Sequence, residues 1–158
     1  MKQIFIRKAV LTDLERLLEF EQGVIAAERP YDPTLRKEKI NYYNIEKMIS
    51  AADVEIVVAE MDGVIIGSGY ARIENAKPYL QHLQHAYLGF MYVAPHHRGK
   101  GVNKKIIDTL GEWCNLQNIT ELRLDVYQMN EAAINAYEKV GFTKHMIEMR
   151  MGLKNKKV

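Results

Sequence analysis

The chain has 158 residues, of which 47% are hydrophobic and 27% charged, and its formal net charge is +2 at pH 7. This balance is typical of a globular protein of about one domain and excludes a largely disordered chain. Its apolar runs fall well short of the ~20 residues of a membrane-spanning helix, so we expect no membrane segment. The near-neutral charge also argues against a general affinity for nucleic acid.

The N-terminus and the single cysteine indicate in which cellular compartment the protein is expected. A charge at Arg7 interrupts the chain before the apolar stretch of a secretory signal could form. One cysteine, Cys114, cannot form an internal disulfide, so we expect a cytoplasmic protein. Cys114 falls on the apolar stripe of an expected helix, which favours packing in the core over a role as a nucleophile.

The first third of the chain predicts one strand and two helices. Residues 3–7 suit a short strand, and Thr12 suits the capped start of a helix that Pro30 interrupts. Thr34 is expected to cap a second helix that runs to about Ser50.

The apolar residues then alternate, as they do in strands. Residues 54–59 and 64–73 are expected strands, joined by Asp62-Gly63, a pair typical of a two-residue hairpin turn. A longer connection over residues 74–85 leads to a further strand over residues 87–93, which is rich in aromatic and β-branched side chains.

After Pro95 the helical period returns, and residues 122–127 alternate as a strand. Asn130 is expected to cap the last helix, and Gly141 stands where a left-handed C-terminal cap is expected. Residues 142–151 suggest final strands. The order β-α-α-β-β-β-α-β-α-β-β predicts a mixed α+β fold.

We expect one domain over residues 1–153, followed by a basic tail over residues 154–158.

A possible anion-binding turn joins the expected strand that ends at Val93 to the following helix, and it contains Gly99 and Gly101. The first N–H groups of a helix lack intrahelical partners and carry partial positive charge, and glycine lets an anion approach the backbone closely. Positive charge is added by four residues: Arg98, Lys100, Lys104 and Lys105. The segment therefore predicts a cradle for a diphosphate, with a tight turn and solvated lysines as the alternative.

Two common diphosphate loops do not fit this segment. A Walker loop would need a glycine at Ala94 and a serine or threonine at Gly101. A dinucleotide fingerprint would need a third glycine at Lys104.

Two segments in register resemble the GNAT superfamily of acetyltransferases. Residues 98–103, Arg-Gly-Lys-Gly-Val-Asn, follow a strand that ends Tyr-Val-Ala-Pro and resemble the acetyl-coenzyme A loop of that superfamily. Residues 130–142 begin with Asn130, end Tyr-Glu-Lys-Val-Gly-Phe, and resemble its second hallmark. Asn103 departs from the usual Gly or Ala, but asparagine tolerates unusual backbone angles, so we expect binding to be kept.

The resemblance implies an acyl-CoA N-acyltransferase fold, whose mostly antiparallel, twisted sheet splays between its fourth and fifth strands and carries helices on both faces. Acetyl-CoA would be the co-substrate. Its pantetheine arm would pair with the edge of residues 90–93. The cofactor-binding residues that the resemblance implies are Met91, Tyr92, Val93, Arg98, Gly99, Lys100, Gly101, Val102, Asn103, Lys104, Asn130 and Tyr137.

Acyl transfer to an amine needs a neutral amine, donors for the oxyanion and a donor for the departing thiolate. The resemblance implies a backbone N–H near Val93 for the oxyanion and Tyr137 for the thiolate, with core packing as the alternative for Tyr137. Many relatives carry a glutamate in the strand before the loop, but residues 87–92 contain no carboxylate. Of the nearby candidates for the base we select His85, with a water chain or a partly deprotonated substrate as alternatives. The other nearby candidates are His82 and Glu74.

The sequence thus predicts an acetyl-CoA-dependent N-acetyltransferase that acts on a primary amine of a small molecule, peptide or protein, by direct attack in a ternary complex. A non-catalytic acyl-CoA-binding module is the first alternative, and a nucleic-acid binder that uses the basic cluster is a distant second. We expect no metal and no membrane partner, and a homodimer only by analogy. Residues that would suit a cationic acceptor are Glu21, Glu28, Tyr31, Tyr42, Tyr43, Tyr79 and Tyr87.

Overall fold

A computed structural model describes residues 2–154. These residues form two compact units, of which the first ends at Tyr127 and the second begins at Gln128. Each unit is described by itself below. The predicted single domain over residues 1–153 stays a prediction, and most of the predicted tail lies outside the described residues.

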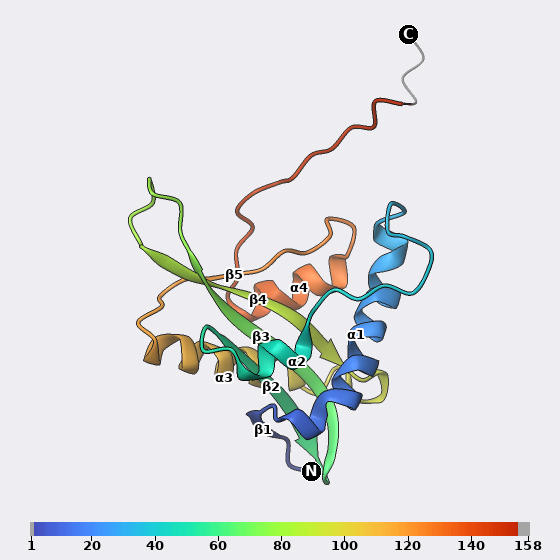
Figure 1. The fold of residues 1–158 in the computed structure, drawn as a ribbon, viewed down its shortest axis with the longest axis vertical. Helices are drawn as coiled ribbons and strands as arrows, with labels where there is room; N and C mark the ends of the chain where they lie inside the picture. The colour runs from blue at the N-terminus through green and yellow to red at the C-terminus, as the bar shows by residue number, and fades with distance from the viewer. Residues whose placement is uncertain (1, 155–158) are drawn as a thin grey trace. The chain divides into compact units, whose positions relative to one another are not determined.

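The first unit contains a five-stranded sheet in the order β1-β2-β3-β4-β5 (Figure 1). Strands β1 to β4 pair antiparallel in sequence order, and β5 lies parallel to β4. The mostly antiparallel sheet is therefore confirmed. The strands are β1 (Phe5–Lys8), β2 (Val54–Met61), β3 (Val64–Asn75), β4 (Gln84–Val93) and β5 (Leu122–Arg123).

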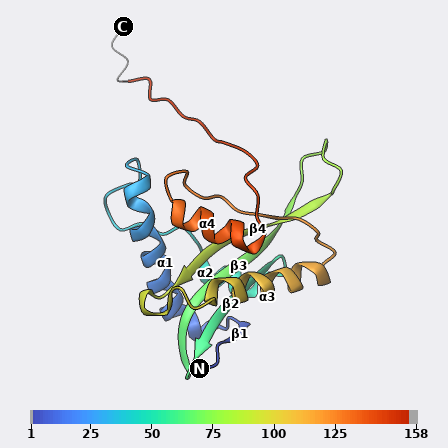
Figure 2. The same cartoon turned by 180° about the vertical axis from the view of Figure 1, so that it is seen from behind.

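Helices cover both faces of this sheet, as the resemblance implied. Helices α1 (Leu14–Glu28) and α2 (Ile45–Ser50) lie on one face, and α3 (Val102–Leu116) lies on the other, which Figure 2 shows from behind. None of the helices within residues 2–154 has the length and apolar composition of a membrane span.

The face under α1 and α2 holds an apolar cluster. It is built from fully buried side chains of α1, α2, β2, β3 and β4, because alternate residues of each strand point to the same face. Its members include Leu17, Phe20, Ile45, Ile56, Val58, Tyr70 and Phe90.

The opposite face brings α3 very close to β3. A Cβ added at Gly69 would stand 2.7 Å from both the side chain of Ile106 and the sulfur of Met91. The missing side chain is what allows the helix to approach, so the glycine at this position is a packing requirement.

Several local predictions are confirmed. Asp62 and Gly63 have φ values of 51° and 75°, the left-handed pair that a tight hairpin between β2 and β3 requires. In the second unit, helix α4 (Glu131–Val140) begins after Asn130, whose side chain accepts a hydrogen bond from the N–H of Ala133 at 3.2 Å. Gly141 ends α4 with a φ of 119°.

The expected helix from Thr34 to Ser50 is mostly wrong. Only α2 is helical there, and Asn44 caps it through the N–H of Lys47, while the N–H and hydroxyl of Thr34 bond to Asp32 instead. Two polar side chains hold the intervening backbone. Gln22 of α1 donates to the carbonyl of residue 40, and Arg29, which directly follows α1, donates to the carbonyls of residues 36 and 38. These tertiary contacts satisfy carbonyls that a helix would otherwise use.

The start of α1 also differs from the prediction. The helix is preceded by a short 3-10 turn over Leu11–Asp13, so Thr12 does not cap it. The buried Asp13 carboxylate accepts from the N–H of Val10 and from both terminal nitrogens of Arg7, at 2.8 to 3.0 Å. This charged network fixes the junction between β1 and α1.

The three strands predicted near the C-terminus are shortened or absent. The strand over residues 122–127 is reduced to β5, and residues 142–154 form no strand within the described chain. Alternating side chains such as Ile147 and Met149 are 76% and 89% exposed there. Alternation alone does not make a strand, because a strand also needs a neighbouring backbone to complete its hydrogen bonds.

Candidate active site

A bulge interrupts β4 at Phe90, whose φ of 55° lies in a region that bulky residues rarely adopt. The register changes there, because Tyr70 pairs with Gly89 but Ser68 pairs with Tyr92, which gives β4 one extra residue. The buried Ser68 hydroxyl donates to the carbonyl of Phe90 at 3.1 Å and holds the bulge. Backbone strain of this kind clusters at functional sites.

Beyond the bulge, β4 has a free edge. Strand β5 pairs only with Ala86 and Tyr87, so no strand of the described residues pairs with this edge over residues 88–93. The sheet is thus splayed between β4 and β5, as predicted. An extended ligand could add to this edge through main-chain hydrogen bonds.

The turn that follows β4 has the predicted form. After a 3-10 turn over Pro95–His97, Gly99 and Gly101 have φ values of 74° and 77°, and α3 begins at Val102. A Cβ at either glycine would meet no heavy atom of the described residues within 4 Å, so the backbone is accessible from outside. The first turn of α3 contains no acidic residue, so its partial positive charge is not neutralised locally.

The basic side chains of this loop differ in their contacts. The Arg98 Nε donates to the carbonyl of Val93 at 2.9 Å, and its guanidinium lies 5.7 Å from the Tyr92 ring centre, so Arg98 ties the loop to the end of β4. Lys104 pairs with Asp108 at 2.6 Å, while the Val102 side chain is buried in the core. The loop residues 98–103 therefore offer a ligand their backbone N–H groups and the exposed side chain of Lys100.

A cavity of about 540 Å³ lies on the α1 and α2 side of the sheet. Cross-strand pairing explains how it is built, because Arg72 lies opposite Tyr87 and Glu74 lies opposite His85. Its lining residues are Tyr42, Tyr43, Tyr70, Arg72, Glu74, His85, Tyr87, Arg123 and Asp125.

The floor of this cavity is aromatic and charged. The Arg72 guanidinium lies over the Tyr70 and Tyr87 rings, at 5.7 and 5.4 Å from their centres, and donates to Glu74 at 2.6 and 3.1 Å. Burial raises the pKa of the Tyr43, Tyr70 and Tyr87 hydroxyls above the ordinary value, and the Asp125 carboxylate raises that of Tyr87 further. At neutral pH these hydroxyls therefore keep their protons and can act as hydrogen-bond donors.

Glu21 has a role that differs from the expected one. The expectation was a carboxylate that faces a cationic acceptor, but Glu21 is fully buried and accepts hydrogen bonds from the N–H groups of Tyr42 and Tyr43 at 2.9 and 2.7 Å. It thereby fixes the segment that carries two tyrosines of the cavity wall. A carboxylate on the apolar face of a helix was the available sequence signal.

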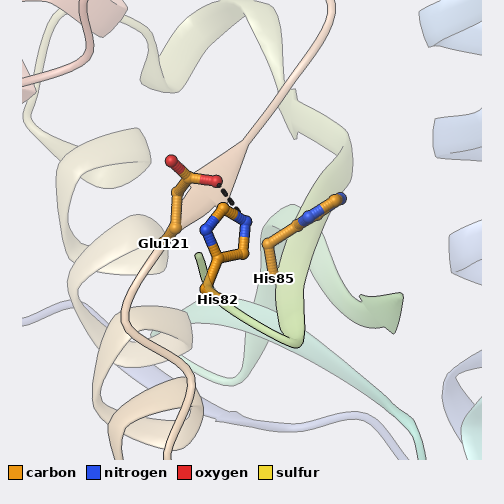
Figure 3. Close-up of side chains that lie close together, drawn as sticks. All are labelled: His82, His85 and Glu121. Carbon is orange, nitrogen blue, oxygen red and sulfur yellow. Dashed lines mark ion pairs between the residues drawn. The ribbon is translucent and has the colours of Figure 1, made fainter. Parts of the chain in front are cut away.

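His85 lies at the end of the cavity with 9% of its surface exposed. Its Nε2 lies 3.6 Å from Oε2 of Glu74, on the neighbouring strand. Its other neighbours, His82 and Glu121, come from the preceding segment and from the residue before β5, as Figure 3 shows. The sequence analysis did not select Glu121 as a site residue. Glu121 lies near the two histidines because β5 pairs with β4. The role of His85 as the base stays a prediction.

The remaining predicted residues, Asn130 and Tyr137, belong to the second unit. Asn130 caps α4, which confirms the structural role that was expected of it. The Tyr137 ring packs edge-on against Phe142 with their centres 5.8 Å apart. The roles of Asn130 and Tyr137 toward a coenzyme stay predictions.

The combination of a splayed sheet, a bulged fourth strand and a glycine turn before α3 defines an acyl-CoA N-acyltransferase fold. A family model described as the acetyltransferase (GNAT) family matches residues 15–142, so the chain belongs to this family.

Two relatives are similar in sequence. The N-alpha-acetyltransferase of Sulfurisphaera tokodaii is 25% identical over 146 residues, which cover 89% of this chain and 81% of that protein. The thialysine N-epsilon-acetyltransferase of Mus musculus is 34% identical over 58 residues, or 37% of this chain and 34% of that protein.

Solved structures show the same fold. The BH1408 protein of Bacillus halodurans, in a mutant form, superimposes with a TM-score of 0.86 at 18% identity, over 94% of this chain and 99% of that one. A predicted acetyltransferase of Clostridium acetobutylicum, solved with acetyl-CoA, has a TM-score of 0.71 at 18% identity, over 98% and 99% of the two chains.

Proposed function

We propose that this protein is an acetyl-CoA-dependent N-acetyltransferase that transfers the acetyl group to a primary amine of a small molecule, peptide or protein. The observation that carries the proposal is the open backbone of Gly99 and Gly101 at the start of α3, directly after a strand with an unpaired edge. The coenzyme in the Clostridium acetobutylicum structure supports this choice of co-substrate.

The coenzyme would be held mostly by backbone groups. Its diphosphate would accept hydrogen bonds from backbone N–H groups within residues 98–103, where the helix dipole favours negative charge. Its pantetheine would extend along the free edge of residues 90–93. The side chains of this edge are already engaged, because Met91 lies near Gly69 and Tyr92 lies near Gly23. Their expected contribution is therefore made through the main chain.

The reaction forms a C–N bond and breaks the thioester C–S bond. The neutral amine attacks the thioester carbonyl, and a backbone N–H near Val93 stabilises the oxyanion of the tetrahedral intermediate. The departing thiolate takes a proton from the Tyr137 hydroxyl. The amine nitrogen releases one proton to water, and the tyrosinate regains one proton from water, so the protons balance. The cavity lined by Tyr43, Tyr70 and Tyr87 is the proposed acceptor site, and its aromatic floor and Asp125 suit a cationic amine.

The substitution Tyr137→Phe tests the proposal. It removes the hydroxyl and keeps the ring, so we expect kcat to fall by about 100-fold while the Kd for acetyl-CoA stays within a factor of about two. Thiol release with a panel of amines and calorimetric titration with acetyl-CoA measure the two quantities. The matched control is Tyr79→Phe. Tyr79 was an acceptor candidate in the sequence, but it does not line the cavity and its side chain is 82% exposed. An unchanged kcat in Tyr137→Phe would contradict the assigned role.

The alternative of a non-catalytic acyl-CoA-binding module predicts a different result. The stretch of β4 before the loop has no carboxylate, and this absence motivates the alternative. Tight binding of acetyl-CoA by the parent protein, without turnover on any amine of the panel, would favour the module.

A further inference from the structure

A second constellation lies at the other end of β4, outside the proposed coenzyme site. His82, His85 and Glu121 each present one ligand atom, and these three atoms lie within 4.8 Å of one another (Figure 3). The three residues come from three places in the chain, namely the segment before β4, β4 itself and the residue before β5. The hydrogen bond from the N–H of Ala86 to the carbonyl of Glu121, at 3.0 Å, fixes this arrangement.

Two imidazole nitrogens in this cluster are buried without a hydrogen-bond partner among the described residues. They are Nε2 of His82 and Nδ1 of His85. Nε2 of His82 lies 3.0 Å from Oε2 of Glu121, but the two atoms lack hydrogen-bond alignment. Buried polar atoms without partners are rare in folded proteins, and a bound ion is one arrangement that satisfies them. A short, unaligned nitrogen–oxygen contact is also what two ligands of one ion make.

Although the sequence led us to expect no metal, we propose that His82, His85 and Glu121 bind one divalent transition-metal ion of the zinc class. Two imidazoles and a carboxylate make up a known three-residue ligand set for Zn²⁺, which leaves the fourth tetrahedral position to water. Zinc bonds of about 2.0–2.2 Å place neighbouring ligand atoms about 3.3 Å apart. The three ligand atoms already lie within 4.8 Å of one another, so side-chain rotations suffice to close the site.

The residues around the three ligands support this assignment. Glu74 lies 3.6 Å from Nε2 of His85, so it can accept the proton of that nitrogen and leave the lone pair on Nδ1 for the metal. Arg123 donates to Oε2 of Glu121 at 2.9 Å, which orients the carboxylate. Metal-bound histidines usually have such a carboxylate partner behind them.

A metal here would join the β3–β4 connection to β4 and β5 where the last two strands pair. It would also occupy the lone pair that a catalytic base needs. The metal role and the predicted base role of His85 therefore exclude each other.

The test is zinc binding by the untagged full chain, freed of metal with a chelator. We expect one Zn²⁺ per chain in equilibrium dialysis, and a rise in Tm when Zn²⁺ is added, because a ligand of the native state stabilises it. His82→Ala and Glu121→Gln should each weaken binding by about 10- to 100-fold or more and remove the rise in Tm. His145→Ala is the matched control, since His145 is exposed and lies in the other unit.

Glu121→Gln keeps the inference falsifiable if a histidine variant fails to fold, because Glu121 is partly exposed and the change preserves its size. Zinc binding that is equal in the parent, His82→Ala and Glu121→Gln would overturn the proposal, as would a parent that binds none. Activity separates the two roles of His85. If turnover is lost in His85→Ala and kept in His82→Ala, whether or not zinc is present, His85 acts as the base and the metal proposal fails.

Discussion

The two ends of β4 differ in how they are closed. Near His85 the strand pairs with β3 on one side and β5 on the other, and charged side chains crowd its surface. After Tyr87 the β5 side is unpaired, a bulge follows at Phe90, and the chain leaves through a glycine turn. One strand thus combines a closed, polar end with an open end whose main-chain groups are free to bind.

This difference indicates what each end can do. The open end offers backbone donors and little side-chain chemistry, which suits a ligand recognised by its diphosphate and its extended amide chain. The closed end offers imidazole and carboxylate groups, which suit a compact cation or a polar substrate group. Substitutions at each end should therefore affect different measurements.

The largest expected effect is at the open end. Gly101→Val adds a side chain where φ is 77° and where the diphosphate would approach, so we expect the Kd for acetyl-CoA to rise by about 100-fold. Gly63→Val is the matched control, because Gly63 has a φ of 75° in the β2–β3 hairpin. It should carry a similar strain of about 1–2 kcal/mol and leave coenzyme binding intact. Equal Kd values for Gly101→Val and the parent would refute the placement of the loop.

Asp13 lies at the junction between β1 and α1, away from both ends of β4, so its substitution should change stability and leave coenzyme binding unchanged. Asp13→Asn removes the charged partner of Arg7, and we expect the free energy of unfolding to fall by about 2 kcal/mol without a change in the Kd for acetyl-CoA. Denaturant titrations measure the first quantity and calorimetry the second. A changed Kd for acetyl-CoA would show that the Asp13–Arg7 pair beside β1 influences the proposed coenzyme site.

The same pair predicts a pH dependence. The hydrogen bonds from Arg7 hold the pKa of Asp13 below its ordinary value of 3.8, so the carboxylate contributes stability that is fully present above that pH. This contribution is lost as the pH falls through the lower pKa of the folded state. The difference in stability between the parent and Asp13→Asn should therefore shrink in acid, and a constant difference down to about pH 2 would contradict this.

A smaller effect is expected at the bulge that divides the two ends. Ser68→Ala leaves the carbonyl of Phe90 without its buried donor, so the free energy of unfolding should fall by about 1 kcal/mol. The control is Ser50→Ala, whose hydroxyl makes an exposed bond to the carbonyl of Lys47 and should change stability by less than about 0.5 kcal/mol. Similar losses in both variants would mean that the Ser68 bond does not hold the bulge.

The smallest effect on stability is expected where β4 becomes unpaired. Tyr87→Phe removes an exposed hydrogen bond to Asp125 of 3.2 Å but keeps the ring under Arg72, so the free energy of unfolding should change by less than about 0.5 kcal/mol. If the cavity binds the acceptor, the KM for the amine should rise while the Kd for acetyl-CoA is unchanged. An unchanged KM with every accepted amine would remove Tyr87 from the acceptor site.

Signals contained within a few neighbouring residues were predictable from the sequence. The Asp62-Gly63 hairpin, the Asn130 cap and the turn at Gly99 and Gly101 each follow from the conformational preferences of the residues themselves. The order of most elements followed from the residue patterns, and the family resemblance then implied the splay beside β4.

Features that depend on distant residues were not predictable in the same way. The segment that contains Thr34 is held by the side chains of Gln22 and Arg29. Residues 142–151 alternate, but the described chain places no neighbouring strand beside them. The approach of Glu121 to the histidines depends on which strands pair and in what register. Tertiary contacts determine the structure at these positions, and local propensity does not predict such contacts.

The absence of a side chain at Gly23 links helix α1 to the open end of β4. A Cβ there would stand 2.6 to 2.7 Å from the Tyr92 ring, so even an alanine would force the aromatic group aside. Replacing a mid-helix glycine by alanine ordinarily adds about 1 kcal/mol of helix stability. In this protein the same change would collide with the far end of the Tyr92 side chain, so the gain in helix stability is set against the cost of moving an aromatic ring that belongs to the strand proposed to hold pantetheine.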